Sequence, residues 1–342
     1  MDSELLYERA RIIREVRAFF DSRQYLAVDT PLLAPDLIPE NCLEVFETSW
    51  LPPGYSANGG LQNSRQQPEK RWLIPSPEIW MKKLIACHRV NMYQICKCFR
   101  NAESRGRLHS PEFTMLEYYT MNADYLNSLA LTEELFTHLC DSVHGGVKTA
   151  FRPPFLQITM EEAFRRWAGF SLAEVTAEGR TAMEKEARRL GLEPALDELK
   201  DSEAIAVLYD LIFIHTVEPF LPKDRPIAIL DYPAFVPCLA QQNNKYTKER
   251  WELYINGIEL ANCFSEETDP AAIRRFFKKE TEKKEQNALI KHQVDQDYWK
   301  NFLPDQNNSA FPPCSGVAMG LDRLIMAFTD KVSIESVFAF PF

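Results

Sequence analysis

The sequence FRNAESRGRLHSPEFTMLEYY, residues 99–119, determines how the rest of the chain is interpreted. Cys96–Asn101 is short and apolar, and Glu112–Tyr119 is rich in Phe, Thr, Met, Leu and Tyr, so each is predicted to be a strand. The loop between them, Ala102–Ser110, has almost no apolar side chains but contains Arg105, Gly106, Arg107 and His109. Such a loop can present positive charge to an anion such as a triphosphate, and an ordinary solvated hairpin tip is the equal alternative.

Composition and charge indicate a globular protein with a sizeable core. The 342 residues are 45% hydrophobic and 26% charged, enough for one large domain or two ordinary ones. The net charge of −10 argues against a protein whose main task is to grip nucleic-acid backbone. No run approaches a membrane span, and the acidic N-terminal segment is not a signal peptide. The eight cysteines lack metal-binding spacing, so we expect reduced thiols and a cytoplasmic protein.

Segments before the hairpin have ordinary structural interpretations. Ser3–Arg23 carries apolar residues at helical spacing, and Tyr25–Leu33 contains Pro31, which indicates an edge or interface strand. Glu47–Arg71 holds several Pro, Gly, Asn and Ser residues and is predicted to be a mobile surface loop. Ser76–Ala86 begins with Ser-Pro-Glu and is predicted to be an apolar helix.

After the hairpin the sequence predicts a helix and then a helical insertion, whose boundaries are marked by Arg152-Pro153-Pro154 and Pro219–Pro226. Leu126–Val143 is predicted to be a helix, and the stretch from Gln157 to about Leu221 is predicted to be a helical insertion without recognisable chemistry. Pro226–Asp231 reads as a buried strand. Ala271–His292 is a charged helix whose mixed signs indicate a solvated face.

Asn256-Gly257, between WELYI and IELANCF, is a strong hairpin signal. A two-residue turn pairs Tyr254 with Glu259, so Glu252 and Glu259 are predicted to share one face of the hairpin. Glu266 joins that face only if a bulge or strand end intervenes near Cys263. The same seven-residue spacing of glutamates also fits one face of a helix. Neighbouring carboxylates at a strand surface require cations, which could be metal ions, a substrate ammonium, or both.

The C-terminal stretch SGVAMGLDRLIMAF, residues 315–328, leads through small residues into a helix. Arg323 stands in its first turn, where free backbone N–H groups already favour anions. A routine strand–helix junction is the alternative interpretation.

In this order the segments resemble motifs 1, 2 and 3 of class II aminoacyl-tRNA synthetases, at about 10–33, 96–119 and 315–328. SPEIWMKKL and WELYINGIELANCFSE narrow the resemblance to the lysyl branch. The resemblance implies an α+β fold, with a single class II catalytic domain over residues 1–342. Its antiparallel sheet would be flanked by helices and carry the helical insertion at about 155–222.

One feature narrows the resemblance further. A lysyl-tRNA synthetase carries an N-terminal anticodon-binding β-barrel, for which we expect no room because motif 1 begins almost at Met1. The chain therefore most resembles the elongation factor P–(R)-β-lysine ligases, which are truncated lysyl-tRNA synthetase paralogues. Ser76 and Ala318 stand where synthetases usually have Ala and Gly, and both are expected to reshape the amino-acid pocket.

The resemblance implies a site for ATP and Mg²⁺. Arg100 would bind the α-phosphate of ATP and the carboxylate being activated, while Phe113 and Arg323 would cover the two faces of adenine. Glu252 and Glu259 would hold Mg²⁺ against the phosphates. The expected catalytic residues are Arg100 and Arg323. Further expected contacts to ATP are Glu103, His109, Leu260 and Gly320.

The resemblance also implies an amino-acid site. Glu78 would bind the amino group near the carboxylate, Glu266 and Tyr119 the distal ε-ammonium, and Asn262 the carboxylate region. Ser76 and Ala318 would line the pocket. No nucleophilic side chain is expected, because the substrate carboxylate is itself the nucleophile and catalysis is positioning and electrostatics.

Three departures from the family pattern lie close to this site. The motif 2 loop is one residue longer than usual, with Ala102 where the family often has Glu. Ser110 replaces an expected Asn before Pro111. Cys263 replaces the usual Gly and is expected to bring a side chain close to the substrate.

The leading hypothesis is a ligase that forms (R)-β-lysyl-adenylate and passes the acyl group to a lysine side chain of elongation factor P. The resemblance implies a homodimer built on motif 1. Aminoacylation of tRNA is a rival, weakened by the acidic charge and the expected lack of an anticodon domain. Another rival activates lysine or a related amino acid for a small molecule. A catalytically dead paralogue would predict losses at Arg100, Arg323 or the glutamates, which are all present.

Overall fold

The computed structural model describes residues 3–341 except 54, 56–66, 104–105, 144–148, 194–195, 197–198 and 305–308. Arg105, one of the loop arginines singled out above, lies outside the described residues. In the part of the chain that the structure describes, no helix is long and apolar enough to cross a membrane.

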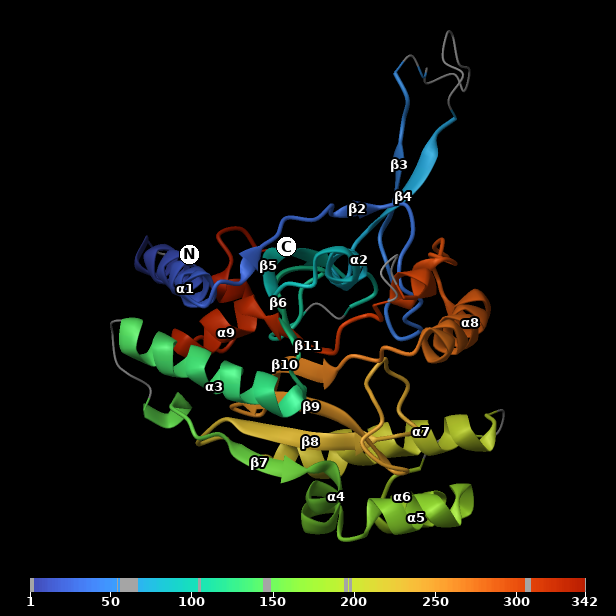
Figure 1. The fold of residues 1–342 in the computed structure, drawn as a ribbon. Helices are drawn as coiled ribbons and strands as arrows, with labels where there is room; N and C mark the ends of the chain where they lie inside the picture. The colour runs from blue at the N-terminus through green and yellow to red at the C-terminus, as the bar shows by residue number, and fades with distance from the viewer. Residues whose placement is uncertain are drawn as a thin grey trace.

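An eight-stranded sheet forms the centre of the protein, in the order β1-β5-β6-β11-β10-β9-β8-β7. Neighbouring strands are antiparallel except at the two edges, where β1 runs parallel to β5 and β7 to β8. This largely antiparallel sheet flanked by helices confirms the α+β prediction (Figure 1). The strands are β1 (Leu26–Ala27), β5 (Met92–Phe99), β6 (Glu112–Met121), β7 (Leu156–Thr159), β8 (Ile227–Pro233), β9 (Thr247–Ile255), β10 (Ile258–Ser265) and β11 (Cys314–Gly320).

Helices and single helical turns surround the sheet. The helices are α1 (Ser3–Ser22), α2 (Glu78–His88), α3 (Tyr125–Ser142), α4 (Met160–Ala163), α5 (Leu172–Glu178), α6 (Arg180–Arg189), α7 (Asp201–Ile212), α8 (Pro270–Asn287) and α9 (Leu321–Phe328). The short turns are η1 (Thr149–Phe151), η2 (Phe164–Ala168), η3 (Phe213–Val217), η4 (Glu218–Phe220), η5 (Tyr298–Phe302) and η6 (Ile334–Val337).

The predicted hairpin is formed by β5 and β6, which lie between β1 and β11 in the sheet. β5 and β6 pair from Met92–Tyr119 to Phe99–Glu112, so the hairpin strands are longer than the sequence suggested. β1 is an edge strand, as Pro31 predicted, because the chain leaves the ladder before that proline.

One face of the sheet packs against α1, α3 and α9. Phe20 of α1 lies against Tyr93 of β5 and Tyr118 of β6, with ring centroids 5.0 and 4.8 Å apart. These residues belong to a buried cluster that continues through β9, β10 and β11. On the other face, α2, α8 and η5 pack around Tyr298, whose ring stacks on Phe277 at 4.7 Å. The strand residues Glu117, Tyr119, Asn262 and Glu252, described below, lie on this second face.

Two loop and helix predictions were partly wrong. Within Glu47–Arg71, predicted to be a loop, the ends form β3 (Glu47–Trp50) and β4 (Glu69–Leu73), which project from the body with β2 (Leu33–Ala34) at their base (Figure 1). Side chains on both faces of β3 are exposed, so its sequence shows no hydrophobic alternation. In the predicted helical insertion, residues 156–159 form β7, and the helices begin at Met160.

A buried ion pair joins three elements of the fold. Asp322 of α9 is 1% exposed, lies 2.7 Å from Arg9 Nη1 of α1, and accepts the backbone N–H of Thr114 of β6 at 2.5 Å. Arg9 also donates to the Thr114 hydroxyl at 3.2 Å. The Asp322 carboxylate therefore connects α1, β6 and α9, which carry the three motif regions.

We predict that Asp322→Ala lowers the free energy of unfolding by about 3 kcal/mol, because it leaves the partly buried Arg9 cation and the buried N–H of Thr114 without their acceptor. Urea denaturation measures this change. Glu134→Gln is the control, since the Arg23–Glu134 pair has the same 2.7 Å separation but is exposed, so we expect a change of about 0.5 kcal/mol. Equal effects of the two substitutions would contradict the prediction.

Candidate active site

Strand register places most of the candidate residues on one face of the sheet, because residues paired across a ladder point the same way. One row across β6, β11, β10 and β9 consists of Glu117, Ala318, Asn262 and Glu252. The adjacent row consists of Tyr119, Gly316, Phe264 and Arg250. The small residues Ala318 and Gly316 thus lie between larger polar neighbours.

The Asn-Gly hairpin has the predicted register, with Glu259 opposite Tyr254. The register then shifts between Glu259 and Ala261, so that Leu260 is the extra residue of a bulge. This shift pairs Asn262 with Glu252 and keeps the following alternate residues on their face. The predicted interruption exists, but it lies at Leu260 and not near Cys263.

Cys263 does not approach the candidate site, which corrects the expectation from sequence. It pairs with Trp251, and both side chains are buried in the cluster on the opposite face. Its Sγ lies 3.2 Å from the Ser315 hydroxyl. Alternation along β10 explains this orientation, since Cys263 follows Asn262 directly. The Leu260 side chain is also buried in that core cluster.

Glu78 and Glu266 come together around a lysine that sequence reasoning missed. The ammonium of Lys82, on α2, lies 2.5 Å from Glu78 Oε1 and 2.6 Å from Glu266 Oε2. Its side chain is 1% exposed. Burial lowers the pKa of Lys82, but Glu266 and Glu78 outweigh this and hold it well above the ordinary value. The signal in the sequence was the i, i+4 spacing of Glu78 and Lys82 on one helix.

A third carboxylate, Glu117, lies beside this ion pair and was also missed. It accepts hydrogen bonds from the Ser76 hydroxyl and the Tyr119 hydroxyl, each at 2.7 Å. Glu117 is 2% exposed in the middle of an otherwise apolar strand, and that contrast was the available signal. Ser76 also accepts the backbone N–H of Glu78 at 3.0 Å, which links the two carboxylates.

Gly316 is required for the close packing of this cluster. A Cβ at this position would lie 2.5 Å from Tyr119 Cε1 and closer still to Glu266 Oε1. Glycine therefore lets the carboxylate and the ring lie directly against β11.

The acidic cluster carries more negative charge than the protein compensates. Burial, and secondarily the charge of Glu78, raises the pKa of Glu117 to about 7. Burial likewise raises the pKa of Glu266 to about 8, although Lys82 opposes the rise. Such sites favour cationic ligands, because a bound cation allows the carboxylates to ionise.

The predicted cationic residues lie towards the other end of this face. Arg100 Cζ lies 5.2 Å from the centroid of the Phe113 ring, and Arg100 Nε is buried without a hydrogen-bond partner among the described residues. Arg323 donates from Nη1 to the Glu259 carbonyl at 2.6 Å and from Nε to the Leu108 carbonyl at 3.3 Å. These bonds join the start of α9 to the tip of the Asn-Gly hairpin and to the motif 2 loop.

His109 and Glu103 lie in the electrostatic range of these arginines. Burial lowers the pKa of His109, the charges of Arg323 and Arg100 lower it further, and Glu103 opposes them. Gly320 precedes α9, and a Cβ there would only touch the Arg323 side chain, at 3.6 Å.

Glu252 and Glu259 share a face as predicted, but Glu252 is already engaged. Its two oxygens accept from Arg250 Nη2 at 2.6 Å and from the Tyr254 hydroxyl at 2.8 Å. Arg250, which sequence reasoning missed, also donates to Asn262 Oδ1 at 3.0 Å. Burial raises the pKa of Glu259 to about 7, and the neighbouring charge of Glu252 adds to the rise.

This pair can accommodate Mg²⁺ together with phosphate oxygens. No group of three or more His, Cys, Asp or Glu among the described residues forms a ready-made metal cage. Mg²⁺ commonly binds through one or two carboxylates plus substrate phosphates, and a cation would relieve the repulsion at Glu259. Glu266 lies apart from this pair and belongs to the Lys82 cluster. The three glutamates of the sequence pattern thus belong to two separate clusters.

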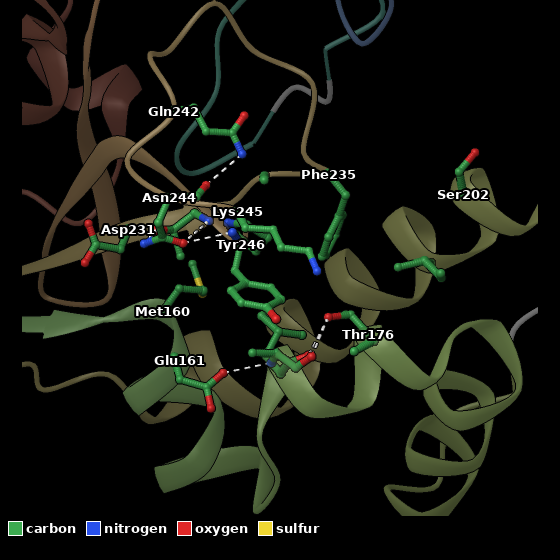
Figure 2. A pocket seen from close by; sticks show the side chains of 17 residues that line it. Met160, Glu161, Thr176, Ser202, Asp231, Phe235, Gln242, Asn244, Lys245 and Tyr246 are labelled. Carbon is green, nitrogen blue, oxygen red and sulfur yellow. Dashed lines mark hydrogen bonds between the residues drawn. The ribbon is translucent and has the colours of Figure 1, made fainter.

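A cavity of about 670 Å³ opens between the helices that follow β7 and the loop joining β8 to β9 (Figure 2). Its lining includes Glu161, Phe235, Lys245 and Tyr246, and no glutamate of the candidate site. Glu161 accepts the Ala173 N–H at 2.9 Å and the Ser171 hydroxyl at 2.7 Å, so this carboxylate is bonded to the protein itself. We assign no chemistry to this cavity.

The family model described as tRNA synthetases class II (D, K and N) matches residues 2–342. The matched range contains both strands of the β5–β6 hairpin, the bulged β9–β10 hairpin, the β11–α9 junction and the helices between β7 and β8.

Proposed function

Since this chain belongs to the class II tRNA synthetases of the D, K and N type, we propose that it activates (R)-β-lysine with ATP and transfers it to elongation factor P. The family implies ATP-dependent ligase chemistry through an aminoacyl-adenylate. The acceptor is a lysine side chain of the elongation factor. The enzyme is proposed to be cytoplasmic and to act as a homodimer.

The observation that carries the choice of a diamino acid is the buried acidic cluster. Glu78, Glu117 and Glu266 surround a single ammonium, so the fully ionised cluster has a formal charge of −2. A β-lysine molecule brings two ammonium groups. Burying this charge without such a partner costs free energy, as the raised pKa values of Glu117 and Glu266 indicate.

The remaining assignments follow the geometry. Arg100 binds the substrate carboxylate and the α-phosphate, which gives its buried Nε an acceptor. The carboxylate oxygen attacks the α-phosphorus in line, the bond to the β-phosphate bridging oxygen breaks, and pyrophosphate leaves. Phe113 and Arg323 hold the adenine, and Glu103, His109, Gly320 and the backbone of Leu260 complete the ATP site. Mg²⁺, held by Glu252 and Glu259, neutralises phosphate charge when bound.

Transfer consumes the adenylate. The neutral amine of the acceptor lysine attacks the acyl carbon, the bond to the phosphate oxygen breaks, and AMP leaves while the amine loses a proton. Asn262, Tyr119 and Glu266 keep the amino acid in place. No protein nucleophile is required, because the protein contributes positioning and electrostatic stabilisation.

The pocket residues support β-lysine over α-lysine. The Ser76 hydroxyl donates its hydrogen bond to Glu117. Ala318 lies between Glu117 and Asn262 in the row of paired residues across the sheet. Both side chains are larger than those usual in synthetases at these positions. They reduce the room beside the carboxylate, where an α-amino group would stand, and β-lysine has its amino group one carbon further along.

Pyrophosphate exchange into ATP, with β-lysine and α-lysine in parallel, tests activation. We expect exchange with both and a higher kcat/KM for β-lysine. The same conditions with elongation factor P and with tRNA side by side then test the acceptor. No exchange with either amino acid would refute the enzyme proposal, and charging of tRNA but not of elongation factor P would make the protein a synthetase.

We predict that the KM for the amino acid falls as pH rises from 6 to 8.5. The free site holds protons on Glu117 and Glu266, with pKa values of about 7 and 8, and two ammonium groups bind best when both are ionised. Binding therefore releases protons, and each released proton changes KM by up to about tenfold per pH unit below the pKa. Glu117→Gln removes one titration and should flatten the profile. A KM independent of pH would contradict the prediction.

A further inference from the structure

Lys82 has no assigned part in the reaction, yet its ammonium stands at the centre of the amino-acid site. It is fully buried and contacts both carboxylates that bind the substrate in the proposal above. Its ammonium also lies 5.4 Å from the centroid of the Phe264 ring. A buried lysine in this place either competes with the substrate ammonium groups for the carboxylates or holds the carboxylates in the orientation that binds the substrate.

The contacts of Lys82 favour the second role, in which it orients the carboxylates. Lys82 takes Oε1 of Glu78 and Oε2 of Glu266, which is one oxygen from each carboxylate. Glu266 Oε1 instead faces Gly316 and the Tyr119 ring, on the side of β11. The lysine thus fixes the rotation of two carboxylates that come from distant segments, α2 and the residue directly after β10. Each keeps a second oxygen with which to accept a substrate ammonium.

The surroundings of Lys82 define its electrostatic effect. The ionisable groups around it are Glu78 on α2, Glu117 and Tyr119 on β6, Glu266 directly after β10, Cys314 on β11, Tyr298 on η5 and Glu40 in the loop before β3. Arg100 and Lys284 partly compensate Glu40. The other three glutamates depend on Lys82, without which the ionised cluster would carry −3.

We propose that Lys82 is a positioning residue that determines specificity for a diamino acid. It orients Glu78 and Glu266 and sets the charge of the cluster to match two ammonium groups. This inference rests on the proposed function, because it takes the acidic cluster to be the amino-acid site. It assigns Lys82 no contact with the reacting atoms, so its removal weakens amino-acid binding more than it slows the chemical step.

The test compares Lys82→Met, Lys82→Arg and wild type in pyrophosphate exchange with β-lysine. For Lys82→Met we expect the amino-acid KM to rise by about 100-fold, as for removal of one member of a buried charge network, with kcat reduced far less. The pH at which KM becomes constant should move upward, since the glutamates lose the cation that favours their ionisation. Lys82→Arg keeps the charge and should restore the wild-type pH profile with a smaller rise in KM.

Lys83→Met is the matched control, because Lys83 follows on the same helix but pairs with Asp295, 2.6 Å away and outside the cluster. We expect wild-type kinetics from it. An unchanged amino-acid KM and pH profile in Lys82→Met would refute the role of Lys82 while leaving the proposed function intact. Should Lys82→Met fail to fold, a shifted pH profile in Lys82→Arg would refute it instead. Wild type without exchange would refute both proposals.

Discussion

Replacing Arg100 with alanine is expected to lower pyrophosphate exchange by at least about 1,000-fold, which is the effect of losing a preorganised group that meets transition-state charge. In the proposed reaction, charge grows on the α-phosphate oxygens as the carboxylate attacks, and Arg100 contacts both. Both kcat and kcat/KM should fall, because this interaction is strongest in the transition state. Arg100→Lys should recover little, since lysine cannot offer a planar bidentate donor.

The fold should tolerate Arg100→Ala. The backbone N–H of Arg100 donates to the Pro111 carbonyl at 2.9 Å, and that bond survives the substitution. The side chain lies over Phe113, a contact that contributes about 1 kcal/mol or less. Thermal unfolding should therefore change little. Arg225→Ala, at an exposed ion pair, is the control for loss of a cation. Exchange that survives in Arg100→Ala would show that the central assignment is wrong.

Gly316→Ala is expected to raise the KM for the amino acid by about 100-fold, in line with overpacking that displaces a buried binding group. The added methyl would overlap the Tyr119 ring and the Glu266 carboxylate. Neither can yield easily, because the Tyr119 hydroxyl is bonded to Glu117 and Glu266 is paired with Lys82. The KM for ATP should change far less, since Arg100 and Arg323 lie elsewhere on the face.

Gly106→Ala provides the control for this substitution. Apart from its own chain neighbours, no atom of the described residues lies within 4 Å of a Cβ at Gly106, so the same added methyl overlaps none of them. We expect wild-type exchange from Gly106→Ala. A normal amino-acid KM in Gly316→Ala would contradict the placement of the substrate against Tyr119 and Glu266.

Features that depend on neighbouring residues could be read from the sequence. The β5–β6 hairpin follows from two apolar runs around a polar loop, and the Asn-Gly turn alone fixes the pairing of Tyr254 with Glu259. The shared face of Glu252 and Glu259 follows from that register. The family resemblance added the order of the motifs, which the match over residues 2–342 supports.

Features that arise only when distant segments of the chain come together could not be predicted from the sequence. The sequence does not distinguish Lys82 from any other lysine on a helix, because its partner Glu266 lies 184 positions later in the chain. Glu117 was missed because its hydrogen-bond donor Ser76 lies 41 positions earlier in the chain, outside the strand that carries Glu117. Cys263 was misplaced because the bulge at Leu260 and the alternation after it determine which face each residue takes. β3 was missed because all four of its side chains are exposed, so no hydrophobic alternation marks its sequence.

The bulge at Leu260 also has consequences for length variation in this family. Glu259 and Glu266 are seven positions apart, an odd number, and one unpaired residue lets both use the same face. An in-frame deletion or insertion of one codon between them would turn Glu266 towards the core while leaving Glu259 in place. Lineages that keep both glutamates should therefore keep this interval constant.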